Sequence, residues 1–319
     1  MRRALCVGID EYSFGSLRGC VSDAEHIADI LTTNYDGSPN FDCRMLKAPV
    51  GGASDCITRV VLREAIEKLF QNKADVALLH FSGHGTINNL DGYLVTQDAR
   101  KYDAGVAMSD ILKWANDSKA EEVVILMDCC FSGTLGNPPA IDNTKALLRE
   151  GVSILTASRS DQSSVEAGGG GLFTSLAVDA LGGGAADVLG AVSAPSLYSY
   201  VEAALGAWDQ RPLFKSHVSQ LVALRRCAPP VDLSILRRLP SMFPLPAEDL
   251  LLDSSYEPTS PNADPEKVAI FQDLQALSRI YLVVPCDASH MYGAAIGSKA
   301  CRLTPSGRYY WRLAANSRI

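Results

Sequence analysis

The sequence lacks long apolar runs and any regular spacing of cysteines. No segment of the 319 residues approaches the roughly 18 apolar residues that a membrane span requires. The apolar run after the amino terminus is only about seven residues long, too short for the core of a signal peptide. Nine cysteines, an odd number without regular spacing, favour a reducing cytosol over a disulfide framework. We therefore expect a cytoplasmic protein with no membrane partner.

Excess positive charge and phosphate-binding motifs are also missing. The net charge of -7 argues against a generic nucleic-acid binder. The glycine run at 168–171 is not followed by the Lys-Ser or Lys-Thr of a P-loop, so it favours a flexible loop over a phosphate cradle. Cys129 and Cys130 are adjacent, which is poor spacing for zinc ligands. No metal site is assigned.

What the sequence does contain is an ordinary apolar content of 47% and an alternation of strand and helix patterns over its first 225 residues. This length suits one large domain plus a small one. The alternation predicts an α/β fold, a mostly parallel sheet with helices on both faces. The expected strands are 4–10, 44–46, 75–81, 91–95, 123–127 and 152–156, and the expected helical faces are 24–31, 62–70, 108–115, 173–181 and 197–205. Ser109 is a candidate helix cap.

Two of the expected strands end in residues that can carry chemistry. The run at 123–127 ends at Asp128 and is followed by Cys129 and Cys130, while the run at 75–81 leads to His84 between two glycines. Ligands of open α/β sheets bind outside the carboxyl ends of the strands. If the two strands are neighbours, His84 and Cys130 face one another as base and nucleophile. The competing interpretation is an inert, buried structural cysteine.

These segments resemble the two signatures of the caspase-like cysteine peptidases, most closely the metacaspases. The matching residues are 81–85 (FSGHG) and 128–133 (DCCFSG). Weaker matches occur in the same order as in the family, at 4–10 (ALCVGID), 17–24 (LRGCVSDA), 156–162 (TASRSDQ) and 171–174 (GLFT). The resemblance covers about residues 1–225, and the fold of that family agrees with the α/β prediction.

The resemblance implies a His84–Cys130 dyad, with the backbone N–H groups of Gly85 and Cys130 holding the oxyanion. It makes Cys129 a bystander. No third member of a triad is evident, and a backbone carbonyl is an alternative that would orient the imidazole. The acidic pocket of the metacaspases corresponds here to Cys20, Asp23, Ser82 and Asp128, which implies cleavage after Arg, with Lys second, because paired carboxylates select a cation. The alternative for Asp23 is a cap on a helix beginning at Ala24.

Some positions depart from the family pattern. Phe131 replaces the histidine common after the metacaspase cysteine, and Ser22 replaces an asparagine. Calcium activates many metacaspases, but no acidic cluster for it is evident; Asp161, Asp179 and Asp187 are scattered. Calcium dependence is left open.

The carboxyl-terminal third has a different composition. We expect a peptidase domain at 1–227, a proline-rich linker at 228–264 with a helix near 231–239, and a small, mainly helical module at 265–319. Asp264 followed by Pro265 marks a helix start. Residues 303–311 weakly resemble the closing segment of winged-helix domains. The module either docks on the peptidase or senses a nucleotide or nucleic acid, since its basic residues interleave with aromatics.

The expected function is therefore a regulated cysteine endopeptidase acting on protein substrates. The candidate signal is a small nucleotide messenger or an activating partner, and a nucleic-acid partner is disfavoured. Bacterial antiviral defence is a candidate setting. The alternative is a catalytically silent scaffold, which the presence of His84, Cys130, Asp23 and Asp128 disfavours.

Overall fold

The computed structural model describes residues 1–52, 56–87, 91–100, 103–129, 147–157, 166–167, 170–205 and 212–319. It divides into two compact units. Unit 1 comprises Met1–Ala186 and Gly190–Ala228, and unit 2 comprises Asp187–Leu189 and Pro229–Ile319. Each unit has its own hydrophobic core.

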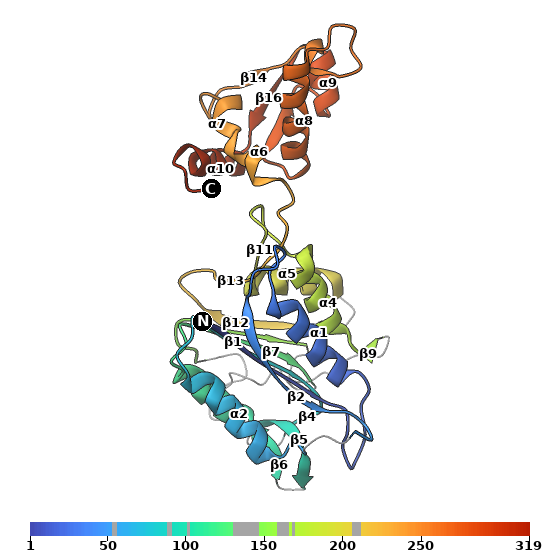
Figure 1. The fold of residues 1–319 in the computed structure, drawn as a ribbon, viewed down its shortest axis with the longest axis vertical. Helices are drawn as coiled ribbons and strands as arrows, with labels where there is room; N and C mark the ends of the chain where they lie inside the picture. Colours follow the sequence, from blue (N-terminus) through green and yellow to red (C-terminus); the bar gives the residue numbers. More distant parts are fainter. Residues whose placement is uncertain are drawn as a thin grey trace. The chain divides into compact units, whose positions relative to one another are not determined.

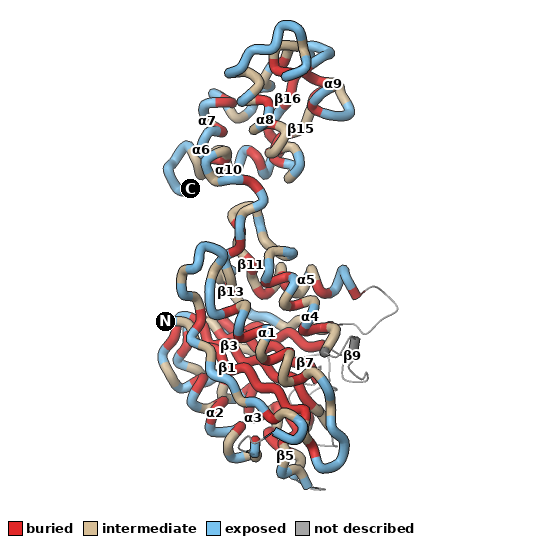
Figure 2. The backbone as a smooth tube through the Cα atoms, turned by 45° about the vertical axis from the view of Figure 1, so that its right-hand side comes forward, coloured by how far each residue is buried: buried red, intermediate tan, exposed pale blue. Residues whose placement is uncertain are grey.

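Unit 1 is built on a six-stranded sheet in the order β12-β8-β7-β3-β1-β2. Five strands are parallel, and only β12 pairs antiparallel, with β8. The central strands are buried along most of their length (Figure 2), as the unbroken apolar runs predict for strands covered on both faces. The strands are β1 (Arg2–Ile9), β2 (Phe41–Ala48), β3 (Val76–Ser82), β7 (Glu122–Asp128), β8 (Val152–Thr156) and β12 (Leu213–His217).

Helices cover both faces of this sheet (Figure 1). One face packs under α2 (Arg59–Gln71) and α3 (Met108–Asn116). The other face packs under α1 (Cys20–Thr32), α4 (Leu172–Asp179) and α5 (Ala194–Leu205). The expected α/β architecture, a mostly parallel sheet between two helical layers, is confirmed.

Unit 1 also contains smaller sheets. A three-stranded antiparallel sheet follows the end of β3, and two two-stranded pairs complete the unit. Their strands are β4 (Gly85–Ile87), β5 (Gly92–Arg100), β6 (Asp103–Ala107), β9 (Glu166–Ala167), β10 (Gly170–Gly171), β11 (Ala191–Ser193) and β13 (Ala223–Arg226). After α4 the chain makes a short π-helix, η2 (Ala180–Gly184), which ends in three consecutive glycines, and Gly183 has φ 135°.

Unit 2 packs helices around the three-stranded antiparallel sheet β14-β16-β15. Its strands are β14 (Leu250–Leu251), β15 (Val283–Cys286) and β16 (Ala300–Leu303). Its helices are α6 (Leu233–Arg237), α7 (Leu239–Met242), the 3-10 turn η3 (Ser254–Tyr256), α8 (Pro265–Arg279), α9 (Met291–Ile296) and α10 (Pro305–Ala315). β15 and β16 are joined through α9 rather than by a tight wing hairpin. The Asp264 carboxylate caps α8, as its sequence predicts.

Two local expectations differ from the structure. The segment at 228–264 is not a bare linker: it supplies α6 and α7, and its apolar side chains, among them Leu236, Leu239 and Phe243, are buried in the core of unit 2. Ser109 is not a cap, because α3 begins at Met108; the Ser109 backbone N–H instead donates to the Asp91 carboxylate at 3.1 Å. Among the described residues, no helix is long and apolar enough to cross a membrane.

Candidate active site

The register of the central strands brings the two sequence signatures to one edge of the sheet. β3 and β7 are parallel neighbours, and Ser82 at the end of β3 pairs with Asp128 at the end of β7. His84 and Cys130 each follow their paired residue by two positions in the sequence. The Gly83 N–H also donates to the Asp128 carbonyl at 3.4 Å. The expectation that the two strands are adjacent is confirmed, while Cys130 itself lies outside the described residues.

The imidazole of His84 is held by the loop that follows β1. Its Nε2 lies 2.8 Å from the Gly15 carbonyl oxygen. The rings of Tyr12 and Phe14 lie against it, with centroid separations of 4.7 and 5.6 Å. The Tyr12 hydroxyl accepts the His84 backbone N–H at 3.1 Å and donates to the Val95 carbonyl at 3.3 Å. Ring and backbone of His84 are therefore both fixed by the loop after β1.

This contact sets the tautomer of His84. A carbonyl oxygen can only accept, so Nε2 carries the proton and Nδ1 is left unprotonated in the neutral ring. Nδ1 is then the nitrogen that can take a proton from a thiol. The backbone carbonyl of Gly15 takes the orienting role that a third side chain has in a triad. Gly83 has to be glycine, because a Cβ there would lie 2.6 Å from the Tyr12 hydroxyl.

Asp23 is buried beside the end of β3. Its carboxylate accepts the Ser82 hydroxyl at 2.9 Å and the Gly171 N–H at 3.0 Å. Among the described residues, no Lys or Arg lies within ion-pair distance of it. The alternative that Asp23 caps a helix beginning at Ala24 is wrong, because α1 begins at Cys20 and the carboxylate bonds other elements.

Asp128 is buried at the same place and is anchored to α4. Its Oδ2 accepts the Thr174 hydroxyl at 2.8 Å and the Thr174 backbone N–H at 3.1 Å. A Cβ on Gly171 would fall 1.9 Å from this oxygen, so any larger residue would displace the Asp128 carboxylate. Gly171 thus touches both carboxylates. The glycine run therefore ends beside the two carboxylates, and the Gly171 N–H donates to that of Asp23.

Burial shifts the acid–base behaviour of this pocket. Removal from water raises the pKa of Asp23, and the hydrogen bonds from Gly171 and Ser82 only partly oppose this. Burial likewise raises the pKa of the Cys20 thiol, against a hydrogen bond with Ser82. Cys20 therefore stays a neutral thiol at neutral pH and is no second nucleophile. All four side chains expected in the acidic pocket are buried: Ser82 and Asp128 end β3 and β7, and Cys20 and Asp23 lie in the first turn of α1.

A carboxylate that the sequence analysis did not single out positions α1. Asp10, directly after β1, accepts the N–H groups of Cys20 and Val21 at 2.8 and 3.4 Å. Gly19 before the helix offers no side chain for capping and has φ 102°. Asp10 is thus the cap of the helix that carries Cys20 and Asp23, and it also stabilises the positive end of the helix dipole.

The structure describes some of the other candidate residues but not all of them. Cys129 is buried in the core under α2 and α3. Gly85 begins β4, next to His84. Phe131, Asp161, Gly168 and Gly169 lie outside the described residues. Within the described ranges, no group of three or more His, Cys, Asp or Glu side chains could hold a metal ion.

Residues that the sequence analysis missed are those that support the predicted ones. Tyr12, Gly15 and Thr174 act through a ring contact, a backbone carbonyl and a hydroxyl. The signal for these residues is the order of strands in the sheet. A loop that follows a strand next to β3 must lie beside His84. The sequence alone did not show which strand that is.

Known proteins resemble this chain in sequence and in fold. Metacaspase-1 of Saccharomyces cerevisiae is 29% identical over 163 residues, covering 47% of this chain and 37% of that protein. Metacaspase-1 of Candida glabrata is 30% identical over 167 residues, covering 47% of this chain and 41% of that protein. The chain thus spans less than half the length of these curated relatives.

A solved structure of a protein from Geobacter sulfurreducens superimposes with a TM-score of 0.51 at 18% identity, covering 69% of this chain and 95% of that one, and so supports the fold. The family model of the caspase domain matches residues 1–222. Because that match covers well over half of the chain, the chain belongs to the caspase domain family, a family of cysteine peptidases.

Proposed function

We propose that this chain is a cysteine endopeptidase in which His84 is the base and Cys130 the nucleophile. The observation that carries the proposal is the fixed orientation of the His84 imidazole. Nε2 bonds the Gly15 carbonyl, which leaves Nδ1 unprotonated in the neutral ring, and His84 follows β3, the neighbour of the strand that precedes Cys130. This is the nucleophile–base pairing that cysteine catalysis requires.

The reaction follows from these roles. Nδ1 of His84 takes the thiol proton of Cys130, and the thiolate attacks the scissile carbonyl carbon. The backbone N–H groups of Gly85 and Cys130 stabilise the oxyanion. The C–N bond then breaks, the imidazolium gives its proton to the leaving amine, and a thioester remains on Cys130. Water, deprotonated by His84, hydrolyses the thioester and releases the acid and the free thiol.

The pocket chemistry supports cleavage after arginine, with lysine second. Asp23 and Asp128 are buried, and the hydroxyl and N–H donors of Ser82, Gly171 and Thr174 fix their orientation. Two oriented carboxylates match the planar guanidinium, which can bind both through paired hydrogen bonds. A lysine ammonium supplies the same charge without the fork geometry. An aspartate side chain would be repelled.

The test is hydrolysis of matched fluorogenic peptides that carry Arg, Lys or Asp before the scissile bond. The wild type should cleave the Arg peptide, Cys130→Ala should be inactive, and His84→Ala should lose roughly 100-fold or more in kcat. Cys129→Ala is the matched control and should retain activity. Cleavage after Asp would contradict the pocket assignment, and Arg cleavage that survives Cys130→Ala would contradict the dyad.

We propose in addition that unit 2 regulates the peptidase. A peptidase that cuts at arginine in the cytoplasm needs a trigger, and a bacterial defence effector is the setting we propose. A nucleotide messenger or an activating partner fits an open hollow of about 340 Å³ on unit 2, whose wall includes Arg279, His290 and Tyr292. Arg279→Ala should abolish activation by the effective member of a panel of nucleotides and calcium, and leave basal hydrolysis unchanged. Activity that no addition changes would favour an unregulated enzyme.

A further inference from the structure

Unit 1 has a second pocket, on the face of the sheet that α2 covers. Its volume is about 300 Å³, and it lies between α2 and the amino-terminal halves of β1 and β2. β2 is the edge strand, and α2 packs over β1 and β3 instead. The register places Arg44 of β2 beside Leu5 of β1 on this face. The face of β2 next to the helix is thus left uncovered, which creates the hollow.

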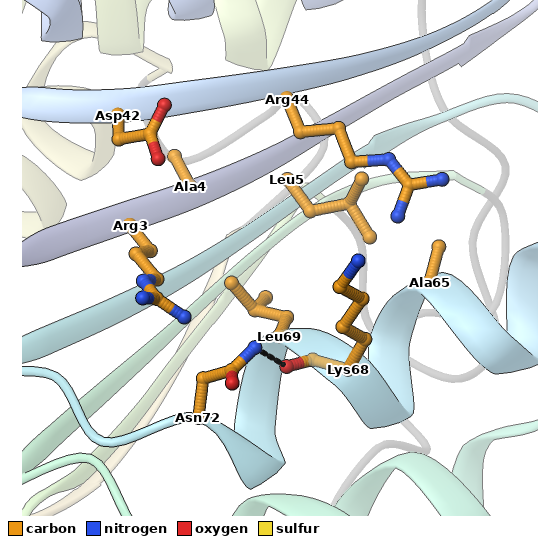
Figure 3. A pocket seen from close by; sticks show the side chains of 9 residues that line it. All are labelled: Arg3, Ala4, Leu5, Asp42, Arg44, Ala65, Lys68, Leu69 and Asn72. Carbon is orange, nitrogen blue, oxygen red and sulfur yellow. Dashed lines mark hydrogen bonds between the residues drawn. The ribbon is translucent and has the colours of Figure 1, made fainter.

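Three cations from three different elements line this pocket: Arg3 of β1, Arg44 of β2 and Lys68 of α2. Figure 3 shows the Lys68 ammonium extending from α2 toward Leu5 and Arg44, while the Arg3 guanidinium lies near Asn72. In the described part of the chain, no carboxylate is within ion-pair distance of any of the three. The lining contains one acid, Asp42, so the pocket is basic on a chain whose net charge is -7.

Among the described residues, no oxygen atom accepts a hydrogen bond from the Arg3 side chain. Its Nε is buried and has no hydrogen-bond partner among the described residues. Its Nη2 contacts only a weak acceptor, the Met1 sulfur, at 3.5 Å. A buried guanidinium N–H without a partner is costly, because its hydration is lost and not replaced. An anionic oxygen in the pocket would offer the exposed Nη2 group a stronger acceptor than the Met1 sulfur.

The rest of the wall consists of the apolar residues Ala4, Leu5, Ala65 and Leu69 together with the amide side chain of Asn72. A pocket of this size with a few convergent polar groups is typical of small-molecule sites. Three cations favour a ligand that carries two charges on one group, and guanidinium is well suited to phosphate. The apolar wall favours an organic body attached to that phosphate, and Asp42 can accept a hydrogen bond from a hydroxyl or amino group.

We propose that this pocket binds a small organic phosphate, held by Arg3, Arg44 and Lys68 with its organic part against Leu5 and Leu69. The site is distinct from the acidic pocket: Arg3 stands at the amino end of β1, whereas Asp10 and the acidic pocket are at the carboxyl end. The two pockets have opposite charge, so a basic peptide side chain does not suit this one. The inference does not depend on peptidase activity.

The test uses pyridoxal 5′-phosphate on the full chain. Its aldehyde condenses with a lysine amine, losing water to give an imine, and borohydride reduces the imine to a stable secondary amine that mass spectrometry maps. Lys68 should be labelled about tenfold more than exposed Lys113, and pyridoxal, which lacks the phosphate, should lose this preference. Adenosine 5′-monophosphate should protect Lys68 better than inorganic phosphate.

Variants locate the site. Arg3→Gln and Arg44→Gln should each abolish the preference for Lys68, whereas Arg63→Gln on the same helix, outside the pocket, should not. Arg44 is exposed, so its variant keeps the test valid even if Arg3→Gln fails to fold. Equal labelling of Lys68 and Lys113, or an equal preference with pyridoxal, would overturn the proposal. Protection by inorganic phosphate equal to that by the nucleotide would overturn its organic part.

Discussion

At the residue scale, Asp128 is held by a hydrogen-bonded chain that runs through Thr174 to a buried histidine. The Thr174 hydroxyl donates to Asp128 at 2.8 Å, and His80 Nε2 lies 3.3 Å from the same hydroxyl oxygen. Because that hydroxyl proton points to Asp128, His80 donates from Nε2, which leaves its buried Nδ1 without a partner in the described chain. Burial lowers the pKa of His80 to about 3, so the ring is neutral at working pH. His80 and Thr174 therefore orient the Asp128 carboxylate.

Thr174→Val should weaken recognition of arginine more than it slows the chemistry. The substitution removes the donor that orients Asp128 and keeps the side-chain shape. We expect KM for the Arg peptide to rise about tenfold, with kcat changed less. The matched control is Thr32→Val at the last residue of α1, where the Thr32 hydroxyl donates to the Ala28 carbonyl at 2.7 Å. A fall in kcat with KM unchanged would show that Thr174 does not act through the pocket.

The ionised Asp23 carboxylate should lower the stability of the fold while it contributes to the binding of arginine. Because burial raises its pKa in the folded state, the ionised carboxylate destabilises the fold relative to the unfolded chain. This penalty is present above the raised pKa and disappears as the pH falls below the ordinary carboxyl value. Asp23→Asn should therefore raise Tm at pH 7 and lose Arg cleavage, and the Tm difference should shrink toward acid pH. A lower Tm at pH 7 would contradict this account.

At the element scale, distant carboxylates place the helices that bear the site. Asp10 caps α1 from ten residues away, and Asp91 binds the first turn of α3 from eighteen residues away. Both lie where the chain leaves or enters a strand, so the sheet itself fixes where these helices begin. Sequence patterns look for caps directly before a helix, and for that reason Ser109 was chosen and Asp91 missed.

Loss of the Asp10 cap should affect stability and specificity together. Asp10→Ala should lower the free energy of unfolding by about 1 kcal/mol, and it should also reduce the Arg preference, because α1 carries Asp23. Thr58→Ala is the control: Thr58 caps α2, accepting the Val61 N–H at 3.3 Å. It should cost similar stability and leave the Arg-to-Lys ratio unchanged. Chemical denaturation and peptide kinetics measure both, and equal loss of specificity in the two variants would contradict the role of Asp10.

The sequence patterns were most informative where the physical signal was local. β3, β7 and β8 followed from short unbroken apolar runs, and the cap of α8 followed from Asp264 and Pro265. The contacts of His84 are not local in sequence. Its Nε2 bonds the backbone carbonyl of Gly15, a group that every residue carries and that no sequence pattern reveals. The prolines of the segment at 228–264 predict a linker, but its apolar residues, such as Leu252, are buried in the core of unit 2.

At the scale of the whole molecule, the chain is two units, each with a core of its own. Unit 1 contains two apolar layers on either side of its sheet, and unit 2 encloses residues from both its linker-like segment and its later helices. The match to the caspase domain family ends at residue 222, close to the boundary at Ala228. A separate core is the property that lets a unit fold alone.

A chain truncated after Ala228 should therefore fold and keep the dyad and acidic pocket. Scanning calorimetry of the full chain should show a transition of unit 1 that persists in the truncated chain. Hydrolysis of the Arg peptide by the truncated chain should no longer respond to the activating signal, because we assign regulation to unit 2. A truncated chain that is folded and responds as the full chain does would remove the regulatory role.

The most direct test of the central claim compares cleavage after arginine with cleavage after citrulline, its uncharged analogue of nearly identical shape. Two buried carboxylates should make kcat/KM at least about 100-fold higher for arginine, since each charged hydrogen bond contributes on the order of 1.5–3 kcal/mol. Asp128→Asn should reduce this ratio by tenfold or more. Equal cleavage of the two peptides by the wild type, or a ratio that Asp128→Asn leaves unchanged, would contradict the account.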